Sequence, residues 1–318
     1  MYNISQVNFE DISDSIDIFI AASGYESRCT LQAKSISKPW TKSFILGFKE
    51  FHDNDVRIEN DAFFKNHNPV YSSINSKVDL DRIVKMIFKS LDETTEQLNE
   101  KINVYVDYSS MPKNWYAEIL IKLYYYEKSE RLNLFFGYSH SEYIPHNETD
   151  KYNEYVKPIE GFSNLSLPVY KTNLILTLGN NKAQVLGIKD YFDINPYLVY
   201  SDNSYNPDFS QEIESKHSEL INSVEEIKIF KLPVHDLTYS YNILLSLSSA
   251  LINESRIIFA PCGPKPFTLL NLLISLNLKY NADVWRISQG NNSEPLDRKA
   301  TGLKTVVRLN KSNMIAST

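Results

Sequence analysis

The chain has 318 residues, of which 42% are hydrophobic, and its formal net charge is −6. This composition supports a sizeable buried core, and the acidic balance argues against a surface that coats DNA or RNA in general. Two cysteines are too few for a disulfide framework, and the sequence shows no signal peptide and no apolar stretch of about 18 residues that would span a membrane. We therefore expect a protein of the reducing cytoplasm with no membrane partner.

Short apolar runs rich in β-branched and aromatic residues predict buried strands. They lie at 17–22, 43–48, 102–108 and 132–138, and again at 173–178, 197–201, 256–261 and 282–288. Runs of this length are typical of parallel strands that are covered on both faces. The sequence LKTVVRL near the carboxyl end predicts one more strand.

Helical patterns alternate with these strands. Residues 78–100 and 235–254 place apolar side chains along one face, and further helices are expected at 114–128 and 267–280. The polar segment 51–77 has no clear pattern and is open to interpretation as a lid or a partner surface.

The order of elements is the same in both parts of the chain, at a nearly constant offset. Strands that alternate with helices and are joined by right-handed crossovers predict a parallel sheet with helices on both faces. We therefore predict an α/β fold of two tandem, pseudo-duplicated Rossmann-like halves with mainly parallel sheets. The first half is expected at 1–150 and the second at 151–318.

Ligands of open α/β sheets bind beyond the carboxyl ends of the strands, where the strand order reverses. The relevant turns are ASGYESRC (22–29) and DYSSMPKNW (107–115) in the first half, and TLGNNKAQ (177–184) and APCGPKPFT (260–268) in the second. From these turns and the last strand of the second half we predict the ligand-binding residues Ser23, Gly24, Tyr25, Glu26, Arg28, Ser109, Ser110, Lys113, Gly179, Asn180, Gly263, Lys265 and Arg286.

A proline precedes each of the two turn lysines, Lys113 and Lys265, at the point where a helix is expected to begin. A rigid turn that aims a lysine beside free helix N–H groups suits a phosphate. The alternative is that the prolines only start the helices and the lysines are solvated. Likewise, Arg28 either contacts a ligand or pairs with a local acid, and Asp107 either caps its turn or serves as a catalytic carboxylate.

The stretch FAPCGPKPFTLLNLL resembles the strand–turn–helix signature of the CRISPR-associated Rossmann-fold sensor domains, the CARF group and its SAVED relatives. Gly263, Lys265 and Pro266 match the family's glycine-rich turn that ends in lysine. The corresponding turn of the first half, with two serines before its lysine, matches more loosely. The resemblance also implies a place beside the ligand for the first-strand turns that contain Gly24 and Gly179.

This resemblance implies a binding unit of two Rossmann-like halves and a cyclic oligonucleotide or related phosphorylated ligand. We accordingly expect a nucleotide-sensing module of a bacterial antiviral defence system that acts with a partner effector chain, because no separate effector domain is visible. We expect no cofactor and no metal, since the sequence has no dinucleotide fingerprint, no P-loop, no HExxH and no clustered Cys/His.

Two other functions stay open. An enzyme that cleaves a nucleotide phosphodiester or N-glycosidic bond would use Glu26 or Asp107, but no Ser/His/Asp motif is recognisable and the catalytic residues are unknown. A non-catalytic scaffold would use the Rossmann-like halves to hold a partner protein.

Overall fold

The computed structural model of the protein describes residues 2–12, 15–36, 40–144, 155–164, 171–202, 207–288 and 296–311. The chain folds into two compact units. Unit 1 comprises Met1–Glu142 and Glu294–Thr318, and unit 2 comprises Tyr143–Ser293. None of the helices in the described ranges combines the length and the apolar character that a membrane crossing requires.

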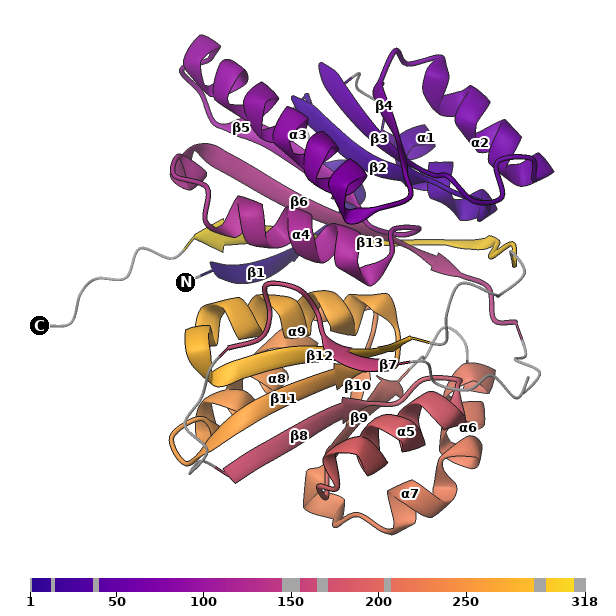
Figure 1. The fold of residues 1–318 in the computed structure, drawn as a ribbon, viewed down its shortest axis with the longest axis vertical. Helices are drawn as coiled ribbons and strands as arrows, with labels where there is room; N and C mark the ends of the chain where they lie inside the picture. The colour runs from indigo at the N-terminus through magenta and orange to yellow at the C-terminus, as the bar shows by residue number, and fades with distance from the viewer. Residues whose placement is uncertain are drawn as a thin grey trace, which may run out of the picture. The chain divides into compact units, whose positions relative to one another are not determined.

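Unit 1 contains a seven-stranded sheet in the order β1-β13-β6-β5-β2-β3-β4 (Figure 1). Its strands are β1 (Tyr2–Val7), β2 (Ile18–Ser23), β3 (Lys42–Phe48), β4 (Val70–Ile74), β5 (Ile102–Asp107), β6 (Leu132–Ser141) and β13 (Ala300–Lys311). The strands from β4 to β6 are parallel, whereas β13 runs antiparallel to β6 on one side and to β1 on the other. Every residue of β2 and β5 is buried, as their continuous apolar sequences require.

Helices cover both faces of this sheet (Figure 1). They are α1 (Leu31–Ser35), α2 (Asp55–Lys65), α3 (Lys77–Gln97) and α4 (Lys113–Tyr124), with short 3-10 turns η1 (Phe9–Asp11), η2 (Ser27–Thr30) and η3 (Ser129–Arg131). Ala33 of α1 and Phe64 of α2 join a core cluster with Phe19 and Ile45 of the sheet. The longest helix, α3, begins with a reciprocal capping box, which satisfies its first N–H groups.

Unit 2 contains a six-stranded sheet in the order β10-β9-β8-β11-β12-β7. Its strands are β7 (Tyr155–Pro158), β8 (Lys171–Thr177), β9 (Tyr197–Asp202), β10 (Ile229–Pro233), β11 (Ser255–Pro261) and β12 (Ala282–Ser288). Its helices are α5 (Lys182–Phe192), α6 (Pro207–Lys216), α7 (Ser218–Asn222), α8 (Leu237–Leu251) and α9 (Lys265–Leu278), with 3-10 turns η4 (Glu226–Lys228) and η5 (Lys279–Asn281). All strands are parallel except β7, which pairs antiparallel with β12.

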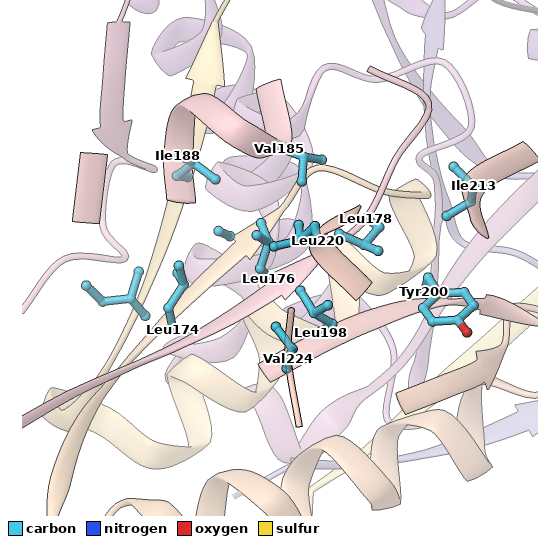
Figure 2. Packing of buried hydrophobic residues seen from close by; sticks show 12 residues of the cluster. Leu174, Leu176, Leu178, Val185, Ile188, Leu198, Tyr200, Ile213, Leu220 and Val224 are labelled. Carbon is cyan, nitrogen blue, oxygen red and sulfur yellow. The ribbon is translucent and has the colours of Figure 1, made fainter. Parts of the chain in front are cut away.

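The core of unit 2 shows how alternate strand residues and helix faces meet. Leu174 and Leu176 of β8 and Leu198 of β9 point to the same side, where Val185 of α5 and Ile213 of α6 pack against them (Figure 2). Successive strand residues point to opposite faces, so this face is built from every second residue. Helices α8 and α9, which pack against each other, contact β10, β11 and β12 as a second layer.

The two sheets share one topology. In each, the first parallel strand lies in the middle, β2 between β3 and β5, and β8 between β9 and β11. Numbering the parallel strands along the chain gives the order 3-2-1-4-5 in both units, and an antiparallel strand borders the fifth. This confirms the predicted fold class of two Rossmann-like halves with mainly parallel sheets.

The structure differs from the sequence-based expectation at the edge strands and at the boundary of the second half. Segment 51–77 contains α2 and β4, an edge strand in which only Ile74 is buried, so its sequence VYSSI lacks the apolar run of a central strand. The second half was expected to extend over 151–318, but β13 near its end pairs with β6 and β1 in unit 1. Unit 2 is therefore inserted in the chain between two neighbouring strands of unit 1.

Candidate functional site at the strand-order reversal

Strand order reverses between the first and fourth parallel strands of each unit, and most predicted site residues lie there. In unit 1 the ends of β2 and β5 bring together Ser23, Gly24, Tyr25, Glu26, Arg28, Ser109 and Ser110, and Lys113 begins α4 directly afterwards. In unit 2 the ends of β8 and β11 carry Gly179, Asn180, Gly263 and Lys265, whereas Arg286 lies on the neighbouring strand β12. The first set belongs to unit 1 and the second to unit 2.

Glu26 is a carboxylate of the unit 1 site that several side chains hold in place. Its Oε2 accepts hydrogen bonds from Nε of Arg28 at 3.0 Å and from Oγ of Ser110 at 3.1 Å. Nη2 of Arg28 lies 2.9 Å from the same oxygen, and Nε of Arg298 lies 3.6 Å from Oε1. The side chain is 14% exposed, and contact with an arginine favours the charged carboxylate. The site thus presents a fixed negative charge at the reversal point.

Arg28 itself is turned into the protein and is only 2% exposed. Its Nη1 donates to the hydroxyl of Tyr138 at 3.0 Å and to the carbonyl of Ser139 at 2.9 Å, and its Nη2 donates to the carbonyl of Ser109 at 3.2 Å. Burial acts to lower the pKa of Arg28, but Tyr138 and Glu26 raise it above the ordinary arginine value. Arg28 therefore pairs with a local acid, and its guanidinium ties the loops after β2 and β5 to strand β6.

Asp107 makes the turn contacts expected of a cap. Its Oδ1 accepts from the backbone N–H of Ser109 at 3.0 Å and from the hydroxyl of Ser109 at 2.5 Å. The same hydroxyl oxygen accepts from the backbone N–H of Ser139 at 2.8 Å. Asp107 is 2% exposed, so it stabilises the turn after β5 from within, while Glu26 is the more accessible carboxylate.

The hydroxyl of Ser23 also points inward. It donates to Oδ1 of Asp61 in α2 at 2.5 Å, and the same oxygen accepts from Nε of Arg57 at 2.8 Å and from the hydroxyl of Tyr71 at 2.9 Å. Burial acts to raise the pKa of Asp61, but the hydrogen bonds from Arg57 and Ser23 bring it below the ordinary value. This network fixes α2 against the end of β2.

Residues that the sequence did not single out complete the unit 1 site. The Nδ2 of Asn60 in α2 donates to the carbonyls of Gly24 at 2.9 Å and Glu26 at 3.0 Å. Oδ1 of Asp297 accepts from the backbone N–H of Ser27 at 2.7 Å. Both contacts join segments far apart in the sequence, and no local motif announces them. With Arg298, they place α2 and the segment before β13 around the Glu26 loop.

The aromatic and lysine residues of the unit 1 site have definite places. The ring of Tyr25 lies 5.9 Å from that of Phe48 and 5.6 Å from that of Phe51, between centroids. Burial raises the pKa of the Tyr25 phenol, with Glu26 adding to the shift. Lys113 is the first residue of α4, and Pro112 is its N-cap. The predicted proline-started helix is therefore present.

The unit 2 site is built from two turns whose backbones touch. A Cβ added to Gly179 would lie 1.9 Å from the carbonyl oxygen of Cys262, and one added to Gly263 would lie 2.5 Å from the carbonyl oxygen of Leu178. Only glycine permits this approach, because any side chain would overlap the neighbouring main chain. The turns after β8 and β11 are consequently locked together at the reversal point.

Helix starts surround these turns. Asn181 caps α5 by accepting from the N–H of Gln184 at 3.0 Å. Lys265 is the first residue of α9, with Pro264 as N-cap and Pro266 within the first turn. The proline-lysine-proline sequence thus starts a helix at the edge of the sheet where ligands of this fold bind.

A buried histidine supports the Gly179 turn. Nε2 of His217 lies 2.8 Å from the carbonyl oxygen of Gly179, so the neutral ring donates from this nitrogen. Burial lowers the pKa of His217 below the ordinary histidine value. The side-chain oxygen of Asn180 in the same turn is buried and has no hydrogen-bond partner within the described part of the chain. A neutral imidazole, that of His217, therefore stabilises the turn through the carbonyl of Gly179.

Comparisons with known proteins do not assign this chain to a family. No family model matches it, and no curated protein matches it significantly. A keto acid-selecting NRPS module with adenylation, ketoreductase and pseudo-Asub domains is 7% identical over 89% of this chain and 34% of that chain, with a TM-score of 0.21. Phosphoethanolamine N-methyltransferase 1 of Haemonchus contortus, in complex with phosphoethanolamine and S-adenosylhomocysteine, is 9% identical over 82% of this chain and 72% of that chain, with a TM-score of 0.20.

The chain spans about a third of the length of the NRPS module. TM-scores this low carry no argument about function, so the chemistry has to be argued from the residues themselves. Within the described ranges, no group of three or more His, Cys, Asp or Glu side chains is placed to hold a metal ion.

Proposed function

We propose that this protein is a nucleotide-sensing module that binds a cyclic oligonucleotide or a related phosphorylated ligand. The observation that carries the proposal is the pair of interlocked turns in unit 2, where Gly179 and Gly263 bring two backbones into contact beside the first turn of α9. The close contact of the two turns fixes them beside the start of α9, and the helix start and Lys265 supply N–H groups and positive charge for a phosphate.

The wider setting rests on the resemblance of the 259–273 stretch to the CARF and SAVED sensors. Proteins of that kind report a ligand to an effector. We therefore propose that this chain acts in the cytoplasm with a partner effector protein in a bacterial antiviral defence system. Unit 1 offers a site of its own, in which the anchored carboxylate of Glu26 suits hydroxyl and amino groups of a nucleotide rather than its phosphates.

The test compares Lys265→Ala with a matched control in the same sheet. Lys171→Ala is the control, because Lys171 is exposed and is the first residue of β8, at the end of that strand away from the Gly179 turn. A panel of cyclic oligonucleotides, linear dinucleotides, ATP and NAD is screened by thermal shift and then by calorimetry. We expect Lys265→Ala to weaken binding at least tenfold, since a charge-assisted hydrogen bond is worth about 1.5–3 kcal/mol. The free energy of unfolding of Lys265→Ala should stay within about 0.5 kcal/mol of that of the parent.

Three outcomes contradict this proposal. If Lys265→Ala melts at a much lower temperature than the parent, the lysine has a structural role. One that melts normally and binds every ligand as the parent does places the ligand elsewhere. A parent protein that responds to no nucleotide favours the scaffold function, in which the Rossmann-like units hold a partner chain.

A second candidate function is favoured by the fixation of Glu26. A carboxylate held by Arg28 and Ser110 at the reversal point is oriented as a glycosidase nucleophile would be. Its oxygen would attack C1′ of a nucleotide ribose, and the C1′–N bond would break as the base leaves with the bonding electrons and takes a proton from water. A second water would then hydrolyse the glycosyl ester and restore the carboxylate.

This second function is tested by chromatography of nucleotides incubated with the protein. Release of free base that is abolished in Glu26→Gln and retained in Asp297→Asn would support it. Asp297 is a suitable control because it lies beside the same loop, and asparagine keeps the oxygen that accepts from Ser27. Intact nucleotides after long incubation with the parent would exclude cleavage.

A further inference from the structure

The edge of the unit 2 sheet carries a group of side chains that the sites above do not use. Strand β7 pairs antiparallel with β12, with Lys157 opposite Arg286 and Tyr155 opposite Ser288. Since strand residues alternate between faces, Lys157, Arg286 and Tyr155 lie on the same face of the sheet. The alternate residues, which include Trp285, lie on the other face and pack against the apolar core.

Two positive charges face each other in this pair. Like charges directly across an antiparallel pair destabilise it, so a sheet normally places an acid at one of the two positions. Within the described part of the chain, neither Lys157 nor Arg286 makes an ion pair with a carboxylate. On the same strand, Asp283 is 1% exposed and pairs with Arg256. Among the described residues, unit 2 thus neutralises its buried charge, whereas the cationic pair nearer the carboxyl end of β12 has no acidic partner.

Tyr155 holds the two cations in place. Its hydroxyl accepts a hydrogen bond from Nη2 of Arg286 at 2.7 Å, and Nζ of Lys157 lies 4.4 Å from its ring centroid. Because the phenol oxygen is used as an acceptor, its own proton is available for donation to another group. Nε of Arg286 is buried and has no hydrogen-bond partner in the described residues. One guanidinium, one ammonium and one phenol therefore converge as donors.

We propose that Arg286, Lys157 and Tyr155 form a binding site for a phosphoryl group. Guanidinium binds phosphate with two parallel hydrogen bonds, the lysine adds a second charge, and the phenol adds a neutral donor. A doubly charged phosphate offsets both cations, whereas a carboxylate offsets only one. An anion between the cations also removes the repulsion across the β7–β12 pair, so binding stabilises this edge of the sheet.

The site is close to the Lys265 turn within the same unit. The pairing of β11 with β12 ends with Phe259 opposite Val284; Pro261 is the last residue of β11, and Arg286 lies two residues beyond Val284 on β12. Adjacent strands are about 4.8 Å apart. A ligand with more than one phosphoryl group therefore fits both positions; this extension rests on the proposed function, whereas the phosphoryl site itself does not.

The experiment titrates inorganic phosphate, pyrophosphate, AMP and ADP into the full-length protein at low salt by calorimetry. Arg286→Gln and Lys157→Gln are compared with Lys171→Gln, an exposed lysine at the start of the central strand β8. We expect pyrophosphate to bind the parent, each of the first two variants to weaken it at least tenfold, and the control to match the parent. Pyrophosphate should also slow hydrogen exchange in residues 155–158 of the parent. Lys157 is exposed, so its variant keeps the test valid if Arg286→Gln fails to fold.

The comparison of ADP with pyrophosphate distinguishes a nucleotide from a free phosphate compound as the ligand that supplies the phosphoryl group. Tighter binding of ADP than of pyrophosphate assigns the site to a nucleotide, and equal or weaker binding assigns it to a free phosphate compound. The proposal is overturned if Lys157→Gln and Arg286→Gln bind pyrophosphate as the parent does, or if Lys171→Gln loses as much affinity as they do. A failure of the proposed function is distinct, because Lys265→Ala would then leave nucleotide binding unchanged while the pyrophosphate result stands.

Discussion

At the same point of the same strand order, unit 1 carries a buried arginine and an anchored carboxylate, whereas unit 2 carries two glycines whose backbones touch. Arg28 joins the loops after β2 and β5 to strand β6 through its guanidinium and fixes Glu26 beside them. In unit 2, Gly179 and Gly263 bring the corresponding loops together without any charged side chain. The topology therefore fixes where a site can form, and the turn residues decide whether it presents a carboxylate or main-chain groups.

The largest effect is expected from a substitution that breaks the charged arrangement of unit 1. Arg28→Met should lower the free energy of unfolding of unit 1 by about 3–5 kcal/mol, because it removes one partner of a buried charge pair and leaves carbonyl groups without donors. Hydrogen exchange of β2, β5 and β6 measures this unit separately from the other. Peptides of unit 2 should exchange as in the parent.

The control for this variant is Arg82→Met, since Arg82 is exposed on α3. It should change the exchange of β2, β5 and β6 little. A loss of less than about 1 kcal/mol in Arg28→Met would show that the network contributes little to unit 1 and would remove one side of the comparison.

The second effect concerns the backbone contact of unit 2. Gly179→Ala should cost about 3 kcal/mol in that unit, because its Cβ would lie 1.9 Å from a main-chain oxygen that cannot move aside. The matching change in unit 1, Gly24→Ala, puts Cβ 3.0 Å from the ring of Phe48, which is able to shift, so less than about 1 kcal/mol is expected. Hydrogen exchange of β8 and β2 measures the loss of stability in each unit. Equal losses for the two variants would show that the backbone contact at Gly179 is no more restrictive than the ring contact at Gly24.

The third effect is a pH dependence confined to unit 2. Burial lowers the pKa of His217 in the folded state, so the unfolded chain takes up its proton first as the pH falls. The contribution of the neutral ring to stability is therefore complete at neutral pH and declines below about 6.5, the ordinary histidine pKa. The drop in melting temperature of unit 2 between pH 7.5 and 5.5 should shrink in His217→Gln, which keeps an N–H donor for Gly179. An unchanged drop would show that other groups cause it.

The smallest effect is expected from a substitution of Ser110, which tests how much this serine contributes to holding Glu26. Ser110→Ala removes one donor to Glu26 and should cost unit 1 about 1 kcal/mol, much less than Arg28→Met. Hydrogen exchange of β2 and β5 checks this, with Ser73→Ala at an exposed position of β4 as the control. A cost close to that of Arg28→Met would mean that the serine, rather than the arginine, dominates the anchoring of Glu26.

Strands buried on both faces were predictable because burial demands continuous apolar sequence, as in IFIAAS of β2. Edge strands were not. The sequence VYSSI of β4 is mostly accessible, and neither β1 nor β10 presents a fully buried apolar run. The helix starts at Lys113 and Lys265 followed from local proline chemistry, and their places agree with the prediction.

The candidate sites were predictable in position but not in their internal contacts. Glycine turns were expected at Gly179 and Gly263, yet the reason for them is a contact between two turns that are distant in sequence. The inward orientation of Arg28 and the bonds from Asn60 and Asp297 to the Glu26 loop depend on tertiary packing. No pattern of neighbouring residues encodes such contacts.

Strand β13 lies between β1 and β6, so the sheet of unit 1 is joined by the latest of its strands in the chain. During synthesis, every strand of unit 2 leaves the ribosome before β13 does. Unit 2 is then able to complete its sheet while β1 still lacks its partner and the edge of β6 remains open. Open edges of this kind promote pairing with other chains. Slow synthesis between β6 and β13 would therefore prolong the period in which the newborn chain is most prone to aggregation.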